Sequence, residues 1–286
     1  RYATMLRHVD PTAELVICGH TDEWNAELLA TVGARRADLV DHLSIHRYWI
    51  TGGPETGFSE EDYYRLLAEA DATEDFIKRS AALVHETLGD KHPIGIALDE
   101  WGVWHPEART WGPGEVARRE PVTYEQANTL RDALAAAIAL EGFHRQCNVL
   151  TLANLAQIVN VLQSVVMTEG SQIWLTPTYH ALRLHAPHIG ATALQVRTEG
   201  GASLPDGSPA VSATASQRGG KVAVTVVNRH YRQAASVSLT AGAGSSATAQ
   251  LLAGASADAG NSLAAPDAVA PAALAVARDG DKGWRV

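Results

Sequence analysis

The sequence predicts an α/β protein in which parallel strands alternate with helices, followed by an antiparallel β-sandwich. Over residues 1–190, short apolar runs alternate with segments of helical periodicity, which is typical of parallel strands covered by helices. Over residues 191–286, short alternating runs such as residues 222–226 are separated by Gly, Ser, Asp and Asn, which is typical of a sandwich. We therefore expect two domains, 1–190 and 191–286.

The first two strand-and-helix units precede residue 90. A strand at residues 15–19 leads to a helix that starts at a Thr21 cap and carries Trp24 on its apolar face. The second strand is expected at residues 39–46. After a loop rich in Gly and Pro, helical periodicity resumes at Ser59, a residue type that favours the start of a helix.

The third and fourth units complete the first domain. The apolar run at residues 94–101 predicts a strand, and an irregular loop follows it. Thr123 and Gln126 have the spacing of a capping box, so we expect a long helix to begin there. The fourth strand is expected at residues 149–155, with a helix at residues 177–185 after it.

Four parallel strands do not close a barrel of this type, which takes eight. The sheet is therefore either an open doubly wound sheet or half of a barrel whose other strands lie outside the chain. Residues 1–7 have the pattern of the end of an amphipathic helix, without an initiator methionine or a signal peptide. The residues that follow the strands are needed to decide between these two folds.

The composition excludes several classes of protein. Among the 286 residues, 46% are hydrophobic and 19% charged, as expected for a folded protein. The formal charge is −9, and no cluster of Lys and Arg interleaves with aromatic residues, so we expect no binding to nucleic acid. No apolar stretch reaches about 18 residues, so no membrane span is expected. Cys18 and Cys147 are expected to be buried free thiols, which suits a cytoplasmic location.

Polar or aromatic residues stand at or just after the end of every predicted strand. They are His20, His46, Tyr48, Asp99, Glu100, Trp101, Asn154 and Gln157. In a barrel, the carboxyl ends of the strands converge on one face, so these side chains would share a pocket. No combination of His, Cys, Asp and Glu has the spacing of a metal site, and no phosphate-binding loop is present, so we expect neither metal nor cofactor.

Glu100 is the candidate catalytic residue. A carboxylate next to tryptophan at the end of a strand is what a retaining glycosidase needs for its nucleophile, although it could instead cap the next segment or pair with an arginine. Tyr48 would donate a hydrogen bond to Glu100, or it is simply a half-buried aromatic residue. Asp99 alternates with Glu100 and is expected to point away from the pocket, into the layer between strands and helices.

The remaining candidates would contact a sugar. His46 lies on the same strand face as Tyr48, so it would line the pocket unless it is a core histidine with satisfied hydrogen bonds. Trp101 and Trp104 are either sugar platforms or core packing, and Trp104, beyond the strand end, is the better placed platform. Asn154 and Gln157 would offer polar contacts from the last strand and the turn after it.

Four co-linear stretches resemble glycoside hydrolase family 51, the α-L-arabinofuranosidases. They are residues 41–49, 97–104, 153–161 and 176–179. The octapeptide at 97–104, Ala-Leu-Asp-Glu-Trp-Gly-Val-Trp, looks like the nucleophile motif of this family, and residues 153–161 look like its last barrel strand. The resemblance implies a (β/α)8 TIM barrel of which this chain supplies strands 5–8, followed by the family's C-terminal sandwich domain.

The resemblance also implies roles for individual residues. Glu100 matches the nucleophile, Tyr48 the tyrosine that hydrogen-bonds to it, Trp104 an aromatic residue of the arabinose subsite and Gln157 a polar contact near the sugar. The acid/base glutamate of the family lies at the end of the fourth strand, outside this chain. Gly102 differs from the common pattern, in which asparagine is frequent at this position.

The expected function is that of a retaining glycosidase. It would release terminal α-L-arabinofuranosyl residues from arabinose-containing oligo- or polysaccharides. The expected partners are a polypeptide that carries the first half of the barrel and, by resemblance, further copies in a homo-oligomer. Two alternatives remain open: another retaining glycosidase of the same clan, such as an endoglucanase or a xylosidase, and a non-catalytic sugar-binding subunit.

Overall fold

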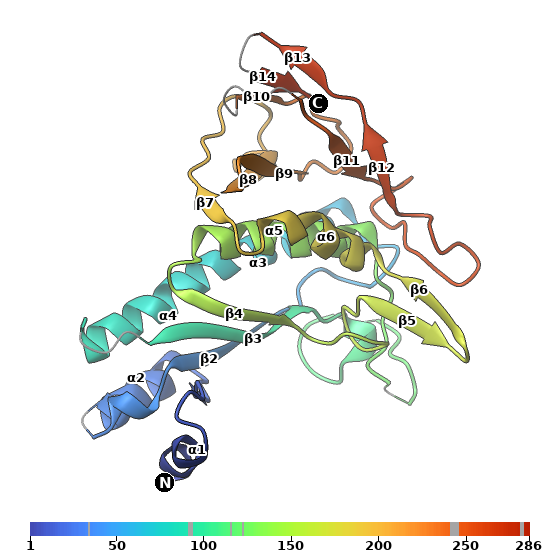
Figure 1. Cartoon of the computed structure of the whole chain (residues 1–286). Coiled ribbons are helices and arrows are strands. Elements are labelled where there is room, and N and C mark those ends of the chain that lie inside the picture. Colours follow the sequence, from blue (N-terminus) through green and yellow to red (C-terminus); the bar gives the residue numbers. More distant parts are fainter. Residues whose placement is uncertain (34, 91–93, 115, 122, 241–245, 281–282) are drawn as a thin grey trace.

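A computed structural model (Figure 1) describes residues 1–33, 35–90, 94–114, 116–121, 123–240, 246–280 and 283–286. Its helices are α1 (Tyr2–Val9), α2 (Asp22–Gly33), α3 (Glu60–Asp71), α4 (Thr73–Leu88), α5 (Leu130–Arg145) and α6 (Pro177–His185). The strands of the first part are β1 (Val16–Ile17), β2 (His42–Trp49), β3 (Gly95–Val103), β4 (Leu150–Leu155), β5 (Val166–Glu169) and β6 (Gln172–Leu175). Those of the second part are β7 (Thr192–Leu194), β8 (Val211–Arg218), β9 (Lys221–Asn228), β10 (Ser238–Thr240), β11 (Ala249–Leu252), β12 (Pro271–Leu274), β13 (Ala277–Asp279) and β14 (Gly283–Arg285).

The first four strands form one parallel sheet in the order β1-β2-β3-β4. The predicted alternation of parallel strands and helices is therefore confirmed. One face of the sheet packs on helices: Leu43, Ile45, Ile96 and Leu98 are buried there in the hydrophobic core. Burial of these branched side chains on one face is the main force that sets the register of the two central strands.

Two helix starts illustrate how local sequence acts. Ser59 caps α3 as predicted, since its hydroxyl accepts from Asp62 N at 3.1 Å and its own N–H donates to Asp62 Oδ2 at 3.1 Å. The predicted cap at Thr123 is wrong. The helix begins at Leu130, behind a capping box that Thr129 and Asp132 form. The Gln126 side chain instead forms hydrogen bonds with the backbone of Val103 and His105, at and just after the end of β3.

Three of the helices, α3, α5 and α6, lie between two layers of strands (Figure 1). In this view α3, α5 and α6 separate the parallel sheet from the C-terminal strands β7 to β14. These later strands form three small antiparallel sheets, β7-β8-β9, β11-β12 and β10-β14-β13. A further antiparallel hairpin, β5-β6, follows the last parallel strand.

Polar contacts join the C-terminal strands to the helices. The guanidinium of Arg229 donates to both oxygens of Asp71 at 3.1 Å, and Tyr63 Oη donates to the Arg229 carbonyl at 3.1 Å. The first amides of α5 are also satisfied from this side, because Leu130 N donates to Ala259 O at 2.8 Å and Arg131 N to the Ala257 carbonyl at 3.0 Å.

Two sequence expectations about exposure are wrong. Cys18 and Cys147 are both exposed, not buried. Trp24 is 54% exposed, and α2 buries Leu29 and Asn25 on its inner face instead. Among the helices that the structure describes, none combines the length and the apolar character needed to cross a membrane.

Candidate active site

A bulge in β3 decides which side chains meet at the site. Ile45 of β2 pairs with Leu98, but the next residue, His46, pairs with Glu100, so β3 contains one extra residue at Asp99. The pairing with β4 shows the same excess, because Leu98 pairs with Ala153 and Trp101 with Leu155. Bulges of this kind interrupt the period of two and re-aim side chains.

The bulge turns Asp99 and Glu100 toward the same face of the sheet. Leu98 and Trp101, on either side of them, both lie in the core on the helix side. The expectation that Asp99 points into the layer between strands and helices is therefore wrong: its carboxylate accepts a hydrogen bond from Ser44 Oγ at 2.8 Å. Strict alternation, which the sequence argument assumed, does not hold across the extra residue.

Trp101 lies on the helix side and is 1% exposed. Its ring packs against Phe143 of α5 at 5.1 Å and against Trp49 at 5.8 Å between ring centroids. The prediction that Trp101 contacts the sugar is therefore wrong, and the alternative of core packing holds.

Glu100 and Tyr48 meet as the sequence predicted. Tyr48 Oη donates to Glu100 Oε2 at 2.8 Å. Burial and then the hydrogen bond to Glu100 raise the pKa of Tyr48 above its ordinary value, so the phenol keeps its proton and remains a donor at neutral pH. The Glu100 side chain is 45% exposed within this chain, so a second molecule can reach it.

His46 lies between two carboxylates. Its Nδ1 is 3.5 Å from Glu100 Oε2 and its Nε2 is 3.3 Å from Asp99 Oδ1. The ring is 47% exposed, so His46 is not a core histidine and lies on the same face as the nucleophile candidate. Ser44, Asp99, His46, Glu100 and Tyr48 thus form one continuous polar row across β2 and β3.

Trp104 continues this row with an aromatic surface. Its ring meets Tyr48 edge to face, with centroids 5.1 Å apart, and its indole nitrogen donates to Ala108 O at 2.8 Å. Trp111 and Tyr124, which the sequence analysis did not single out, extend the surface at 5.2 and 5.9 Å from Trp104. Both are about half exposed, at 48% and 49%. Aromatic side chains in a row near a carboxylate are suited to stacking against the apolar faces of sugars.

A buried arginine holds this loop in place. Arg109 donates to the carbonyls of Trp104, Trp111, Pro113 and Ile50. Burial lowers the pKa of Arg109, but arginine remains a cation under any working condition. A cation that satisfies four carbonyls fixes the backbone that carries both tryptophans.

A second buried network supports the end of β3. Gln126 accepts from His105 N at 2.9 Å and donates to the Val103 carbonyl at 3.0 Å. Gln163 accepts from Val103 N at 2.8 Å. Val103 is the last residue of β3. Its backbone N–H and carbonyl are both satisfied by side-chain amides, so the strand can end there without leaving buried backbone groups unpaired.

Asn154 and Gln157 are exposed. Asn154 alternates with Ala153 and Leu155, which pack on the core, so its side chain lies on the Glu100 face of the sheet. Gln157 follows β4, at a point where Ala156 N donates to the Trp101 carbonyl at 3.1 Å. The roles predicted for both residues remain predictions.

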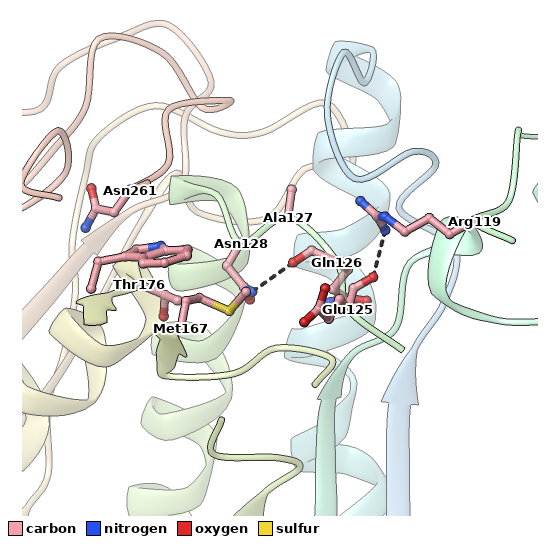
Figure 2. A pocket seen from close by; sticks show the side chains of 9 residues that line it. Arg119, Glu125, Gln126, Ala127, Asn128, Met167, Thr176 and Asn261 are labelled. Atoms are coloured by element: carbon pink, nitrogen blue, oxygen red, sulfur yellow. Dashed lines mark hydrogen bonds between the residues drawn. The ribbon is translucent and has the colours of Figure 1, made fainter. Parts of the chain in front are cut away.

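A pocket of about 240 Å³ adjoins this region (Figure 2). It is lined by Arg119, Glu125, Gln126, Ala127, Asn128, Met167, Trp174, Thr176 and Asn261. Arg119 donates to the Glu125 carbonyl at 2.7 Å and Asn128 to the Gln126 carbonyl at 3.3 Å, so these polar groups are engaged with one another. Glu100 is not among the lining residues, and we assign the pocket no role in the chemistry.

The fold and the site together are those of a β/α protein that carries a glycosidase-like site. An exposed carboxylate lies beside a tyrosine and a tryptophan near the carboxyl ends of parallel strands. Residues 99–285 match the family model described as the alpha-L-arabinofuranosidase C-terminal domain. The chain belongs to this family. The predicted resemblance to glycoside hydrolase family 51 is thereby confirmed.

Curated relatives and a solved structure agree. The chain is 35% identical over 255 residues to an intracellular exo-alpha-L-arabinofuranosidase of Bacteroides ovatus, covering 85% of this chain and 47% of that protein. It is 31% identical over 207 residues to an intracellular exo-alpha-(1->5)-L-arabinofuranosidase of Streptomyces lividans, covering 69% of this chain and 30% of that protein. The crystal structure of the GH51 arabinofuranosidase from Xanthomonas axonopodis pv. citri superposes with a TM-score of 0.83 at 28% identity, covering 100% of this chain and 58% of that one. The chain thus spans between 30% and 58% of the length of these proteins.

Proposed function

We propose that this chain carries the nucleophile of a retaining α-L-arabinofuranosidase and that the nucleophile is Glu100. One observation carries the proposal: Tyr48 holds Oε2 of Glu100 at 2.8 Å, at the carboxyl end of a parallel strand and on an exposed face. Because Tyr48 and His46 both contact Oε2, the other oxygen, Oε1, is the one we assign to attack on the anomeric carbon.

The reaction is a double displacement. Oε1 of ionised Glu100 forms a bond to the anomeric carbon, while the bond from that carbon to the leaving oxygen breaks and a protonated glutamate gives that oxygen its proton. The same glutamate, now ionised, takes a proton from water, whose oxygen attacks the anomeric carbon and releases Glu100 as a carboxylate. The two carboxyl groups of such a pair stand about 5–5.5 Å apart.

The acid/base glutamate would come from a polypeptide that carries the first half of the barrel. In this chain β1 and β4 are the two edges of the four-stranded sheet, and each offers a row of backbone groups for further strands. We therefore assign β1 to β4 as strands 5–8 of a (β/α)8 barrel. The length of the Xanthomonas arabinofuranosidase supports this assignment, since this chain covers 58% of it and the remainder is long enough to include further strands.

The substrate class follows from the relatives. The names of the Bacteroides and Streptomyces proteins specify exo-acting arabinofuranosidases, and we propose that this protein likewise releases terminal arabinofuranosyl groups from oligo- or polysaccharides. Both names also specify an intracellular protein, which supports a cytoplasmic location. We further propose a homo-oligomer, to be tested by light scattering.

Substitution of Glu100 in the complete barrel tests the assignment. Glu100→Gly should abolish hydrolysis of an aryl α-L-arabinofuranoside, and added azide, which can attack in place of the carboxylate, should restore release of the aryl group. Glu169→Ala, an exposed glutamate on the β5-β6 hairpin, is the control and should retain activity. Full activity in Glu100→Gly would remove the proposal.

Two further measurements separate the alternatives. A panel of aryl glycosides distinguishes an arabinofuranosidase from an endoglucanase or a xylosidase by the sugar that is released fastest. A mechanism-based inhibitor that labels Glu100 excludes a non-catalytic sugar-binding subunit, because only a reacting carboxylate forms the covalent adduct.

A further inference from the structure

We propose that Asp99 is a positioning residue for the nucleophile and acts through His46. This inference rests on the proposed function, since it assigns Glu100 the attack on the sugar. It concerns a carboxylate that the sequence argument placed on the wrong face of the sheet. The bulge brings Asp99 to the Glu100 face, where it faces the imidazole of His46.

The ring of His46 is held between two carboxylate oxygens. Nε2 lies 3.3 Å from Asp99 Oδ1, and Nδ1 lies 3.5 Å from Glu100 Oε2. The two nitrogens point in different directions from one planar ring, so fixing the first nitrogen fixes the direction of the second. Asp99 thereby sets the orientation in which Nδ1 faces the nucleophile.

Ser44 limits the hydrogen-bonding roles open to this ring. Its hydroxyl donates to Asp99 Oδ1 at 2.8 Å, because an ionised carboxylate can only accept. Ser44 Oγ therefore presents lone pairs to His46 Nε2, which is 3.5 Å away. Both ring nitrogens thus face acceptors only, so the ring acts as a donor at each, with Nε2 directed at Asp99 and Ser44 and Nδ1 at Glu100 Oε2.

The anchored ring and Tyr48 act on the same oxygen of the nucleophile. Tyr48 Oη and His46 Nδ1 both approach Glu100 Oε2, from the neighbouring strand β2. Two contacts from fixed groups restrict the rotation of the carboxylate more than one contact does. Loss of Asp99 removes the carboxylate that faces Nε2, so the orientation of the His46 ring is no longer fixed from that side.

A purely structural role for Asp99 would look different in experiments. A structural residue would lower the melting temperature and the number of active molecules, but each folded molecule would react normally. A positioning residue lowers the rate of each folded molecule. Because Glu100 bonds to the sugar only during the reaction, the loss should fall on kcat and leave KM nearly unchanged.

The test is a double-mutant cycle in the complete barrel, with activity normalised to active sites titrated with a mechanism-based inhibitor. In the wild-type background, Asp99→Asn should lower kcat by about 10- to 100-fold, the size of effect that a misplaced reacting group produces. In a His46→Ala background, the same change should cost less than about 3-fold, because the group through which Asp99 acts is absent. The matched control is Asp38→Asn. Asp38 is an exposed carboxylate that pairs with Arg36 and precedes β2, at the end of the strand away from His46.

His46→Gln provides a second background if His46→Ala does not fold. An equal loss on Asp99→Asn with and without His46 would overturn the relay, and so would a wild-type kcat in Asp99→Asn. Glu100→Gly, assayed in parallel with azide, keeps the two proposals apart. If Glu100→Gly is inactive and rescued while Asp99→Asn is normal, only the role of Asp99 fails. If Glu100→Gly remains active, the proposed function itself fails.

Discussion

Removal of one hydroxyl, in Tyr48→Phe, measures how much the tyrosine contributes to the nucleophile. The Tyr48 hydroxyl donates to Glu100 Oε2 at 2.8 Å, while its ring packs edge to face on Trp104. Phenylalanine keeps the ring and this packing, so the substitution removes the hydrogen bond alone.

The expected loss follows from the charge on the acceptor. A hydrogen bond to a charged group contributes about 1.5–3 kcal/mol, and about 1.4 kcal/mol corresponds to a factor of ten. The Glu100 side chain is 45% exposed, so water replaces part of the lost bond and the lower part of this range applies. We expect kcat/KM to fall by about 10- to 30-fold, mostly through kcat.

The assay is steady-state hydrolysis of an aryl α-L-arabinofuranoside by the complete barrel. The ratio of wild type to Tyr48→Phe should be constant from about pH 5 to about pH 8, because the phenol, whose pKa is raised, keeps its proton throughout. Tyr2→Phe, on a side chain that is 86% exposed, is the control for loss of a phenol. Activity of Tyr48→Phe within twofold of the wild type would refute the role of this hydrogen bond.

Three further predictions concern stability. Gly102 has φ +136°, and a Cβ there would lie 3.1 Å from Gln163 Oε1, so Gly102→Ala should lower the free energy of unfolding by about 1–3 kcal/mol in chemical denaturation; an unchanged midpoint would contradict the strain. Burial raises the pKa of Glu141 from 4.5 to about 7, so this group is neutral in the fold where it is already ionised in the unfolded chain. The wild type should therefore lose stability as the pH rises from about 4.5 to about 7, and Glu141→Gln should show a smaller loss in melting temperature over this window; equal losses would exclude Glu141 as the source. Arg131 is fully buried, lies 3.6 Å from Asp132 Oδ1 and donates to the carbonyls of Gly52 and Pro54, so Arg131→Met should cost about 3–5 kcal/mol by removing the cation from these buried acceptors, which calorimetry would detect.

Much of the layered fold could be predicted from the sequence, because apolar runs and helical periodicity depend on neighbouring residues alone. The error at Thr123 shows the limit. Thr123 and Gln126 have the spacing of a capping box, but the Gln126 amide instead bonds to Val103 and His105, which lie more than 20 positions earlier. A local pattern cannot reveal a distant partner that competes for the same side chain.

The part of the site that depends only on the approximate ends of the strands could be predicted from the sequence. Tyr48 and Glu100 meet because both lie toward the carboxyl ends of neighbouring parallel strands, as the sequence predicted, although β2 and β3 end at Trp49 and Val103 and not at residues 46 and 101. Asp99 was assigned to the wrong face because one extra residue interrupts the alternation. A bulge depends on the pairing with two neighbouring strands, and no single strand sequence contains that information.

The aromatic residues of the loop beyond β3 were not predictable. Trp111 and Tyr124 approach Trp104 from an irregular segment without periodicity. The position of Trp111 depends on Arg109, which donates to the carbonyls of Trp111, Trp104 and Ile50. In the sequence this arginine resembles any surface cation, since nothing adjacent to it indicates burial.

The N-terminus of α5 has a consequence for protein engineering. Its first amides donate to carbonyls of residues 257–259, and a Cβ on Gly260 would lie 2.8 Å from Asn128 O. A chimera that joins residues 1–190 to the C-terminal module of another relative would leave these amides unsatisfied unless the graft reproduces this segment. A chimera with its junction near residue 190 should therefore keep residues 257–260 of this protein within the grafted C-terminal part, so that α5 retains these acceptors.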